Sequence, residues 1–371
     1  MQRILPRILH FFQGEAVLSV ALLLALISAF VVPPDAAYLG YIDWDTLALL
    51  FGLMAVVKGF QQIGLFDFLG GGLLRWMGTS RQMLLVLVFL PFVFSMLITN
   101  DVALLTFVPF GMAVLRMAKQ ERLLIPLTVL QTIAANLGSM LTPMGNPQNL
   151  YLYNRSGMGF FALCGLMLPY VLLSGACLAL LIVFRKNAPV SCKVTPSRLT
   201  GGRSLLFCLI GFALCLLSIL KLLPPLIVAA AVAAFLILWN RQLLVGLDYA
   251  LLGTFVAFFI FVGNMGRIDW FQHALSAVLT GRETLVAVLT SQIISNVPAA
   301  LLLSGFTDQW SALLVGCNLG GLGTLIASMA SVISYKLAAE ACPDRRGAYL
   351  LQFTLYNLLL LAVLLAVAAV L

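Results

Sequence analysis

Charged residues are scarce in this sequence. Only 9% of its 371 residues are Asp, Glu, Lys or Arg, whereas 62% are hydrophobic. Water-soluble domains carry about 25% charged residues, so this composition excludes a water-soluble globular protein. The charges sum to a net +8, which could indicate nucleic-acid binding. Their distribution along the chain fits membrane topology instead, and we expect no nucleic-acid partner.

Motifs for enzymatic chemistry are lacking as well. The sequence contains no HExxH or GxSxG motif and no nucleotide-binding P-loop, so we expect neither an enzyme nor ATP hydrolysis. The seven cysteines show no CxxC or metal-ligand spacing and are expected to be apolar packing residues. We therefore expect no cofactor and no metal other than Na⁺. A cleavable signal peptide is not evident, so the first apolar run is expected to be a retained span.

Long apolar runs fill most of the chain, and a run of roughly 20 residues can cross the membrane. Two amphipathic stretches, 64–79 and 268–282, are predicted to lie in the membrane interface. The fold class is therefore predicted to be an all-α polytopic membrane protein. The predicted spans are 16–32, 44–60, 160–184, 204–220, 226–239, 249–263 and 349–371.

Two further apolar segments are predicted to be broken helices. The segment of about 123–154 has no charged residue and contains Pro143, Gly145 and Pro147, which should interrupt a helix near its centre. The segment of about 310–335 is predicted to break in the same way.

Two other segments are predicted to be re-entrant hairpins. The first, about 82–118, has Thr99-Asn100-Asp101 at its tip, and its second arm, 102–115, is short for a membrane span. Two short spans over 82–115 remain an alternative. The second hairpin, about 283–306, has Ser295-Asn296-Val297-Pro298 at its centre.

The distribution of basic residues predicts the orientation. With both hairpins re-entrant, all but four of the 21 Lys and Arg residues lie on one side of the membrane. Making 284–306 a true span would place Lys336, Arg345 and Arg346 on the other side, against the positive-inside rule. We therefore predict nine spans and two hairpins in a bacterial-type inner membrane, with the N-terminus cytoplasmic and the C-terminus periplasmic.

An internal repeat relates the two halves. Thr99-Asn100-Asp101 aligns with Ser295-Asn296-Val297, Asn136-Leu-Gly-Ser139 with Asn318-Leu-Gly-Gly321, and Ile42-Asp43-Trp44 with Leu247-Asp248-Tyr249, all in the same order. We predict a first repeat at 1–185, a linker with an extra span at 186–222, and a second repeat at 223–371. The extra span inverts the second repeat, as in secondary transporters.

The hairpin tips and helix breaks carry neutral polar groups at bilayer depth. Helix N-termini offer N–H groups to anions, whereas carbonyl, hydroxyl and amide oxygens suit Na⁺. A site of this kind could bind a cation and an anion together. The tip residues of this type are Ser95, Thr99 and Asn100 in the first hairpin and Ser291, Ser295 and Asn296 in the second.

Asp101 is the one carboxylate deep in the apolar part of the sequence. An intramembrane acid is a candidate for carrying a coupling proton. Alternatively, Asp101 could cap the second arm of its hairpin by accepting backbone N–H bonds.

The motif Asn136-Leu-Gly-Ser-Met-Leu-Thr-Pro-Met-Gly-Asn-Pro-Gln-Asn149 resembles the broken-helix signature of the ion transporter superfamily. Asn318-Leu-Gly-Gly-Leu-Gly-Thr324 resembles the same signature in the second repeat. The superfamily includes divalent anion:sodium symporters, citrate transporters, arsenite efflux pumps and one class of sodium/proton antiporter. The resemblance covers roughly residues 42–371 and implies an elevator motion and often a homodimer.

The resemblance also implies two kinds of binding site. The implied ion-binding residues are Ser95, Thr99, Asn100, Thr142, Gly145, Ser291, Ser295, Asn296, Gly323 and Thr324. The implied substrate-binding residues are Asn100, Asn146, Pro147, Asn149, Asn296 and Pro298.

One departure from the symporter pattern bears on the substrate. Where the symporters carry Ser-Asn-Thr at both tips, this sequence has Asp101 in one third position and Val297 in the other. The leading hypothesis is a secondary active transporter of a small anion, coupled to Na⁺ or H⁺. The alternatives are an arsenite or metalloid efflux permease, a sodium/proton antiporter and, less favoured, an ion channel.

Overall fold

The computed structural model describes residues 15–74, 77–190, 199 and 202–371. These residues fold almost entirely into helices, and the one β-bridge among them pairs Thr79 with Pro189. The start of the predicted first repeat and parts of the linker at 186–222 lie outside the described residues. The observed fold is all-α, as predicted.

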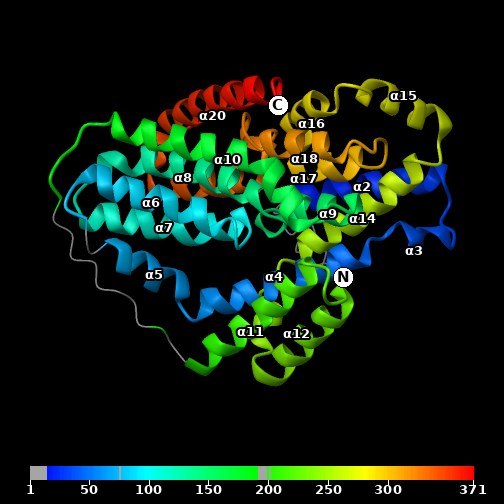
Figure 1. Cartoon of the computed structure of the whole chain (residues 1–371), viewed down its shortest axis with the longest axis horizontal. Coiled ribbons are helices and arrows are strands. Elements are labelled where there is room, and N and C mark those ends of the chain that lie inside the picture. Colours follow the sequence, from blue (N-terminus) through cyan, green and yellow to red (C-terminus); the bar gives the residue numbers. More distant parts are fainter. Residues whose placement is uncertain (1–14, 75–76, 191–198, 200–201) are drawn as a thin grey trace, which may run out of the picture.

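The first part of the chain forms nine of the described α-helices (Figure 1). They are α2 (Ala16–Val31), α3 (Ala37–Tyr41), α4 (Trp44–Gln62), α5 (Leu65–Leu74), α6 (Ser80–Phe94), α7 (Asn100–Met117), α8 (Leu124–Gly138), α9 (Pro147–Ser156) and α10 (Phe160–Val183).

The second part has ten α-helices, of which the first is an added helix and the other nine repeat this order. They are α11 (Gly202–Ile219), α12 (Pro225–Trp239), α13 (Gln242–Val245), α14 (Tyr249–Met265), α15 (Asp269–Leu279), α16 (Glu283–Ile294), α17 (Asn296–Leu303), α18 (Trp310–Leu319), α19 (Met329–Ala341) and α20 (Arg346–Ala368).

The helices form two groups that lie side by side (Figure 1). In one, α8 is surrounded by α6, α7, α10, α19 and α20, and every residue of α8 is buried. In the other, α4 packs against α11 and α12, while α2 packs against α14. A helix without an exposed face is expected at the centre of a membrane protein, where apolar side chains and neighbouring helices cover it.

Five helical segments among the described residues are long and apolar enough to cross a membrane, and seven are if each bent pair counts as one span. The five are Asn100–Met117, Glu121–Leu141, Phe160–Val183, Gly202–Ile219 and Pro343–Ala368. The chain is thus a multi-pass membrane protein. All seven predicted spans coincide with helices, namely α2, α4, α10, α11, α12, α14 and α20. Of these, α10, α11 and α20 meet the length and hydropathy of a span by themselves, and α4 and α14 do so together with their bent partners. The helix α2, at 16 residues, is shorter than the usual span.

The structure differs from the sequence-based expectation at α7. The predicted second arm of the first hairpin was too short to span, but α7 has 18 residues. It is longer because Asn100 and Asp101 belong to its first turn and because the helix continues through Arg116 and Met117. By length alone, α7 could therefore cross the membrane.

The two stretches predicted to lie in the interface correspond to α5 and α15. The axis turns by 59° between α4 and α5, and by 104° between α14 and α15. Both preceding helices start with an aspartate cap: Asp43 accepts a hydrogen bond from the Thr46 amide and Asp248 from the Leu251 amide, each at 2.9 Å.

An ion pair fastens the loop after α2 to the end of α14. Arg267 Nη1 lies 2.7 Å from Asp35 Oδ2, at the surface. The hydrogen bond from the Arg267 guanidinium lowers the pKa of the Asp35 carboxyl. Because both groups are exposed, this pair contributes little to stability.

Candidate functional site

Each predicted hairpin has a tip where two helices meet. In the first, residues 95–99 separate α6 from α7, and Thr99 precedes the first turn of α7. In the second, Ser295 alone separates α16 from α17, and its φ of 76° lies in the region that L-residues rarely adopt. Both tips are therefore tight turns within apolar surroundings.

Each tip packs against the break of a broken helix in the same manner. Thr142 donates a hydrogen bond to the Met96 carbonyl, and the aligned Thr324 donates to the Gln292 carbonyl. Gly138 allows this approach in the first half, because a Cβ there would lie 1.9 Å from the Phe92 carbonyl oxygen. The same hydrogen bond thus joins tip to break in both halves.

Gly320 takes the place of Gly138 in the second half. A Cβ on Gly320 would lie 2.6 Å from Ser291 Oγ, whereas one on Gly138 would lie 2.8 Å from Ser95 Oγ. Glycine at these two aligned positions lets the tip serines touch the broken helices. Of the predicted ion-binding residues, Ser95 and Ser291 are therefore buried against the breaks.

The two broken helices cross through a reciprocal set of amide contacts. Asn136, near the end of α8, accepts a hydrogen bond from Ser328 at 3.1 Å and donates to Ser331 at 3.3 Å. Those serines are the N-cap and third residues of α19.

The aligned Asn318 repeats this arrangement toward α9. It donates to Asn149 Oδ1 at 2.7 Å and accepts from Asn146 Nδ2 at 3.5 Å. Asn146 and Asn149 are the N-cap and third residues of α9. Each broken helix therefore places one asparagine on the first turn of the other.

The two tip asparagines have different surroundings. Asn100 donates to Asn136 Oδ1 at 2.9 Å and accepts from its neighbour Asp101 N. Asn296 lies beside Gly321, where a Cβ would be 3.0 Å from its Nδ2. The first tip is thus joined to the amide crossing, and the second faces a position without a side chain.

The remaining predicted ion-binding residues lie around these breaks. Gly145 packs against the first tip, since a Cβ there would lie 2.7 Å from the Ser95 carbonyl oxygen. Gly323 has a φ of 108° and lies against the Gln292 side chain. Ser295 Oγ donates to the Ala327 carbonyl at 3.4 Å. The structure therefore brings both predicted sets together, one at each tip.

A cavity of 170 Å³ opens beside the first tip, and we call it the tip cavity. Its volume is that of about six water molecules in the liquid. Among the predicted substrate residues, Asn146 and Pro147 line it, while Pro298 lines a smaller pocket with Asp101 and Ser295. Its polar lining is Lys58, Gln61, Thr99, Asp101, Asn146 and Asp248.

The helix start at this cavity has unused hydrogen-bonding groups. Asn146 Oδ1 and Gln148 Nε2 are buried and have no hydrogen-bond partner among the described residues. Asn149, another predicted substrate residue, is fully buried and donates to three carbonyls of the break. Asn146 is thus placed for a ligand, whereas Asn149 holds the break together.

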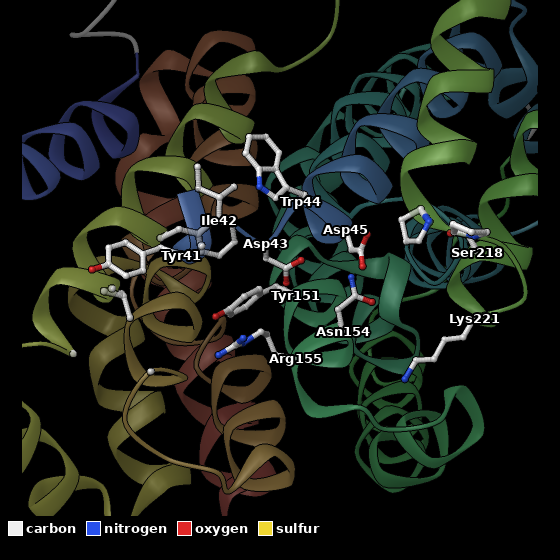
Figure 2. A pocket seen from close by; sticks show the side chains of 18 of the residues that line it. Tyr41, Ile42, Asp43, Trp44, Asp45, Tyr151, Asn154, Arg155, Ser218 and Lys221 are labelled. Atoms are coloured by element: carbon white, nitrogen blue, oxygen red, sulfur yellow. The ribbon is translucent and has the colours of Figure 1, made fainter. Parts of the chain in front are cut away.

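A second, larger cavity of 1130 Å³ is the one in Figure 2, and we call it the large cavity. The labelled side chains around it include Asp43, Asp45, Tyr151, Asn154 and Arg155 (Figure 2). Asn154 donates to Thr46 Oγ1 at 2.9 Å, which ties the end of α9 to the start of α4.

The two cavities lie toward opposite ends of the same three helices. The start of α4 lines the large cavity and its later part the tip cavity, and the order is reversed along α9 and α14. Many lining positions are aligned in the repeat. These pairs, large cavity first, are Asp43 and Asp248, Phe259 and Met54, Gly263 and Lys58, Gly266 and Gln61, and Tyr151 and Ile333.

Aromatic packing surrounds Tyr151 at the wall of the large cavity. The ring of Tyr151 lies 5.5 Å from that of Phe259 and 6.3 Å from that of Phe255, measured between centroids. Its hydroxyl hydrogen-bonds Ser304 Oγ at 2.8 Å. These contacts join α9 to α14 and to the end of α17.

Sequence reasoning missed several polar residues of the site. Gln292 donates to the carbonyls of Gly320 and Leu322 and accepts from the Thr324 amide at 2.8 Å. Its position next to Ser291 in an apolar helix was a signal of this role. Lys58 was assigned only to topology and Asp248 only to the repeat, yet both line the tip cavity.

Paired broken helices, paired hairpin tips and cavities toward opposite ends of the same three helices define a membrane transport protein. The chain belongs to the citrate transporter family, whose model matches residues 11–309.

Relatives carry related names. The inner membrane protein YbiR of Escherichia coli is 31% identical over 345 residues, covering 88% of this chain and 89% of YbiR. "Uncharacterized transporter MJ0456" of Methanocaldococcus jannaschii is 30% identical over 361 residues, covering 95% and 96%. A 46 kDa membrane protein of Mycobacterium leprae is 26% identical over 350 residues, covering 81% and 80%. The family model and the name of MJ0456 indicate a transporter, and the names of the other two relatives indicate a membrane protein.

Proposed function

We propose that the protein is a secondary active transporter that moves a small anion across the inner membrane, driven by Na⁺ or H⁺. The observation that carries this proposal is the pair of unequal cavities at repeat-aligned positions, 1130 Å³ and 170 Å³. A transporter with alternating access needs such a pair, because one side is open while the other is closed.

The unequal helix bends support an elevator-type motion. The aligned joints α4–α5 and α14–α15 bend by 59° and 104° in the same structure. Exchanging these two conformations would close the large cavity and widen the tip cavity. In this proposal the group around α8 moves together with α16, α17 and α18, which contact it through α18. Both tips would then be carried past the group formed by α4, α11, α12 and α14.

The proposed binding groups follow from the contacts at the tips. Each tip presents hydroxyl, amide and carbonyl oxygens, the donor set that Na⁺ prefers. The anion would lie in the tip cavity at the start of α9, where helix N–H groups favour negative charge. At this helix start the buried Gln148 Nε2 is the free donor that suits an anion, whereas the free group of Asn146 is the acceptor Oδ1, which suits the coupling cation.

Proton coupling is the alternative to sodium, and Asp101 is its candidate. Asp101 lines both the tip cavity and the small pocket that reaches Ser295 of the other tip. A carboxyl group between the two tips is placed to be protonated and released as the cavities exchange.

We further propose that the N-terminus is cytoplasmic, the C-terminus periplasmic and the protein a homodimer. In this orientation the large cavity faces the periplasm and the tip cavity the cytoplasm. The asymmetry of the basic residues supports the orientation, and the resemblance to the superfamily supports the dimer.

The test is transport by purified protein in liposomes. Dicarboxylates, citrate, sulfate, phosphate and arsenite are offered under separate Na⁺ and H⁺ gradients, with protein-free liposomes as the control. Accumulation of an anion that collapses when the driving gradient is dissipated is expected. Equal flux in the absence of any ion gradient would contradict coupling and favour a channel.

Metalloid efflux is the second candidate function. Asp101 in the tip cavity would repel a dianion but not arsenous acid, which is uncharged at neutral pH. Arsenite movement without movement of any anion in the same assay would favour this function over the first.

A further inference from the structure

We infer that Lys58 recognises the charge of the substrate, and that the substrate therefore carries at least one full negative charge. This inference rests on the proposed transport of a small anion. Lys58 lies on α4, in the helix group opposite the tips, and lines the tip cavity together with Thr99 and Asn146. It is the one lysine or arginine among the residues that line this cavity.

The Lys58 side chain is free to bind a ligand. Within the described part of the chain the one ion pair joins Arg267 and Asp35, so no carboxylate lies within ion-pair distance of Lys58. Its stem runs over Gly246, where a Cβ would come within 3.2 Å of Cε and 3.9 Å of Nζ. Glycine at 246 leaves room for the side chain to lie along the cavity mouth.

The two carboxylates of the cavity already have favourable partners. Asp248 caps α14 through the Leu251 amide at 2.9 Å. Asp101 occupies the first turn of α7, where the helix dipole stabilises negative charge. Lys58 therefore remains the charged group of the cavity whose charge no contact offsets.

The repeat shows that this lysine is not a requirement of the scaffold. The aligned position on α14 is Gly263, which lines the large cavity. A basic residue needed only to anchor the helix in the membrane interface would not have to point into a cavity. Of these two aligned positions, only the one in the tip cavity carries a positively charged side chain.

The experiment compares Lys58→Gln and Lys58→Arg with the wild-type protein in the liposome assay. The probe is whichever anion of the citrate, dicarboxylate, sulfate and phosphate panel the wild type accumulates. Lys119→Gln is the matched control, because Lys119 is an exposed lysine that lines neither cavity. Losing one charge-assisted contact should raise the KM of Lys58→Gln roughly ten-fold or more.

Lys58→Arg should stay within a few-fold of the wild-type KM, and the maximal rate of both variants should change little. An unchanged KM in Lys58→Gln would overturn the role of Lys58 while leaving anion transport intact. Failure of the wild type to move any anion would instead overturn the proposed function. Because Lys58 is exposed, both variants should fold, which elution of a single peak on size exclusion verifies.

Discussion

The contribution of the contacts between the two broken helices to stability can be tested by replacing Asn136. Replacing it by alanine removes its contacts with Asn100, Ser328 and Ser331, at 2.9, 3.1 and 3.3 Å. Hydrogen bonds between helices of membrane proteins contribute about 0.6 kcal/mol each on average. Three such bonds amount to about 2 kcal/mol. Leaving their partners buried and unpaired adds to this cost, so we expect a loss of about 2–4 kcal/mol.

The free energy of unfolding can be measured by SDS titration in mixed micelles, with tryptophan fluorescence as the signal. The matched control is Asn357→Ala, because Asn357 is equally buried but donates only to the Phe353 carbonyl within its own helix. This control should lose less than about 1 kcal/mol. Asn318→Ala should behave like Asn136→Ala, since it removes the contacts to Asn146 and Asn149.

A double-mutant cycle of Asn100→Ala and Asn136→Ala isolates the bond between the tip and the crossing. A coupling energy of about 0.6–1.7 kcal/mol is expected. Zero coupling together with wild-type stability of Asn136→Ala would refute the argument that this amide network holds the break. Wild-type transport by a strongly destabilised variant would show instead that the network serves stability alone.

Four further predictions concern the site and the topology. Asn296→Ala should abolish transport with normal membrane expression, and wild-type uptake would exclude this residue from the site. Asp101→Asn should remove the pH dependence of transport, whereas an unchanged pH profile would favour the capping role. Gly138→Ala should reduce folded yield, because its Cβ would overlap the Phe92 carbonyl at 1.9 Å, and Gly157→Ala, in open space, should cost only about 1 kcal/mol for its positive φ. A cysteine at position 371 should react with an impermeant reagent from the periplasm, and labelling solely from the cytoplasm would contradict the second hairpin.

The position of a helix was predictable from the sequence where a single local property, such as a long apolar run or a proline, determines where it begins or ends. Helices α10, α11 and α20 follow from apolar runs that have no alternative to a membrane span. The break of the first broken helix follows from Pro143 and Pro147, which cannot continue the hydrogen-bonding ladder. The length of α7 was underestimated, because Asn100 and Asp101 were assigned to the turn and Arg116 to the loop, whereas all three lie within the helix.

The site was predictable in its residue types and less so in their pairings. Asn136 and Asn318 were recognised as repeat-aligned residues, but each one contacts the opposite repeat, and a sequence alignment gives no information on that exchange. Gln292 and Lys58 were missed because their roles depend on neighbours distant in sequence, Leu322 and Asn146 among them. Whether a lysine lies at a membrane surface or a cavity mouth is decided by tertiary packing.

The unequal halves show what a repeated pattern cannot specify. The joints α4–α5 and α14–α15 follow the same succession of a capped apolar helix and an amphipathic helix, yet they bend by 59° and 104°. Two joints of similar sequence can bend differently when the two bend angles differ little in free energy. The packing of the rest of the protein then decides which angle each joint adopts. The cavities differ in size for the same reason. A repeat pattern therefore predicts that two related conformations exist. Only the three-dimensional structure reveals which conformation each half adopts.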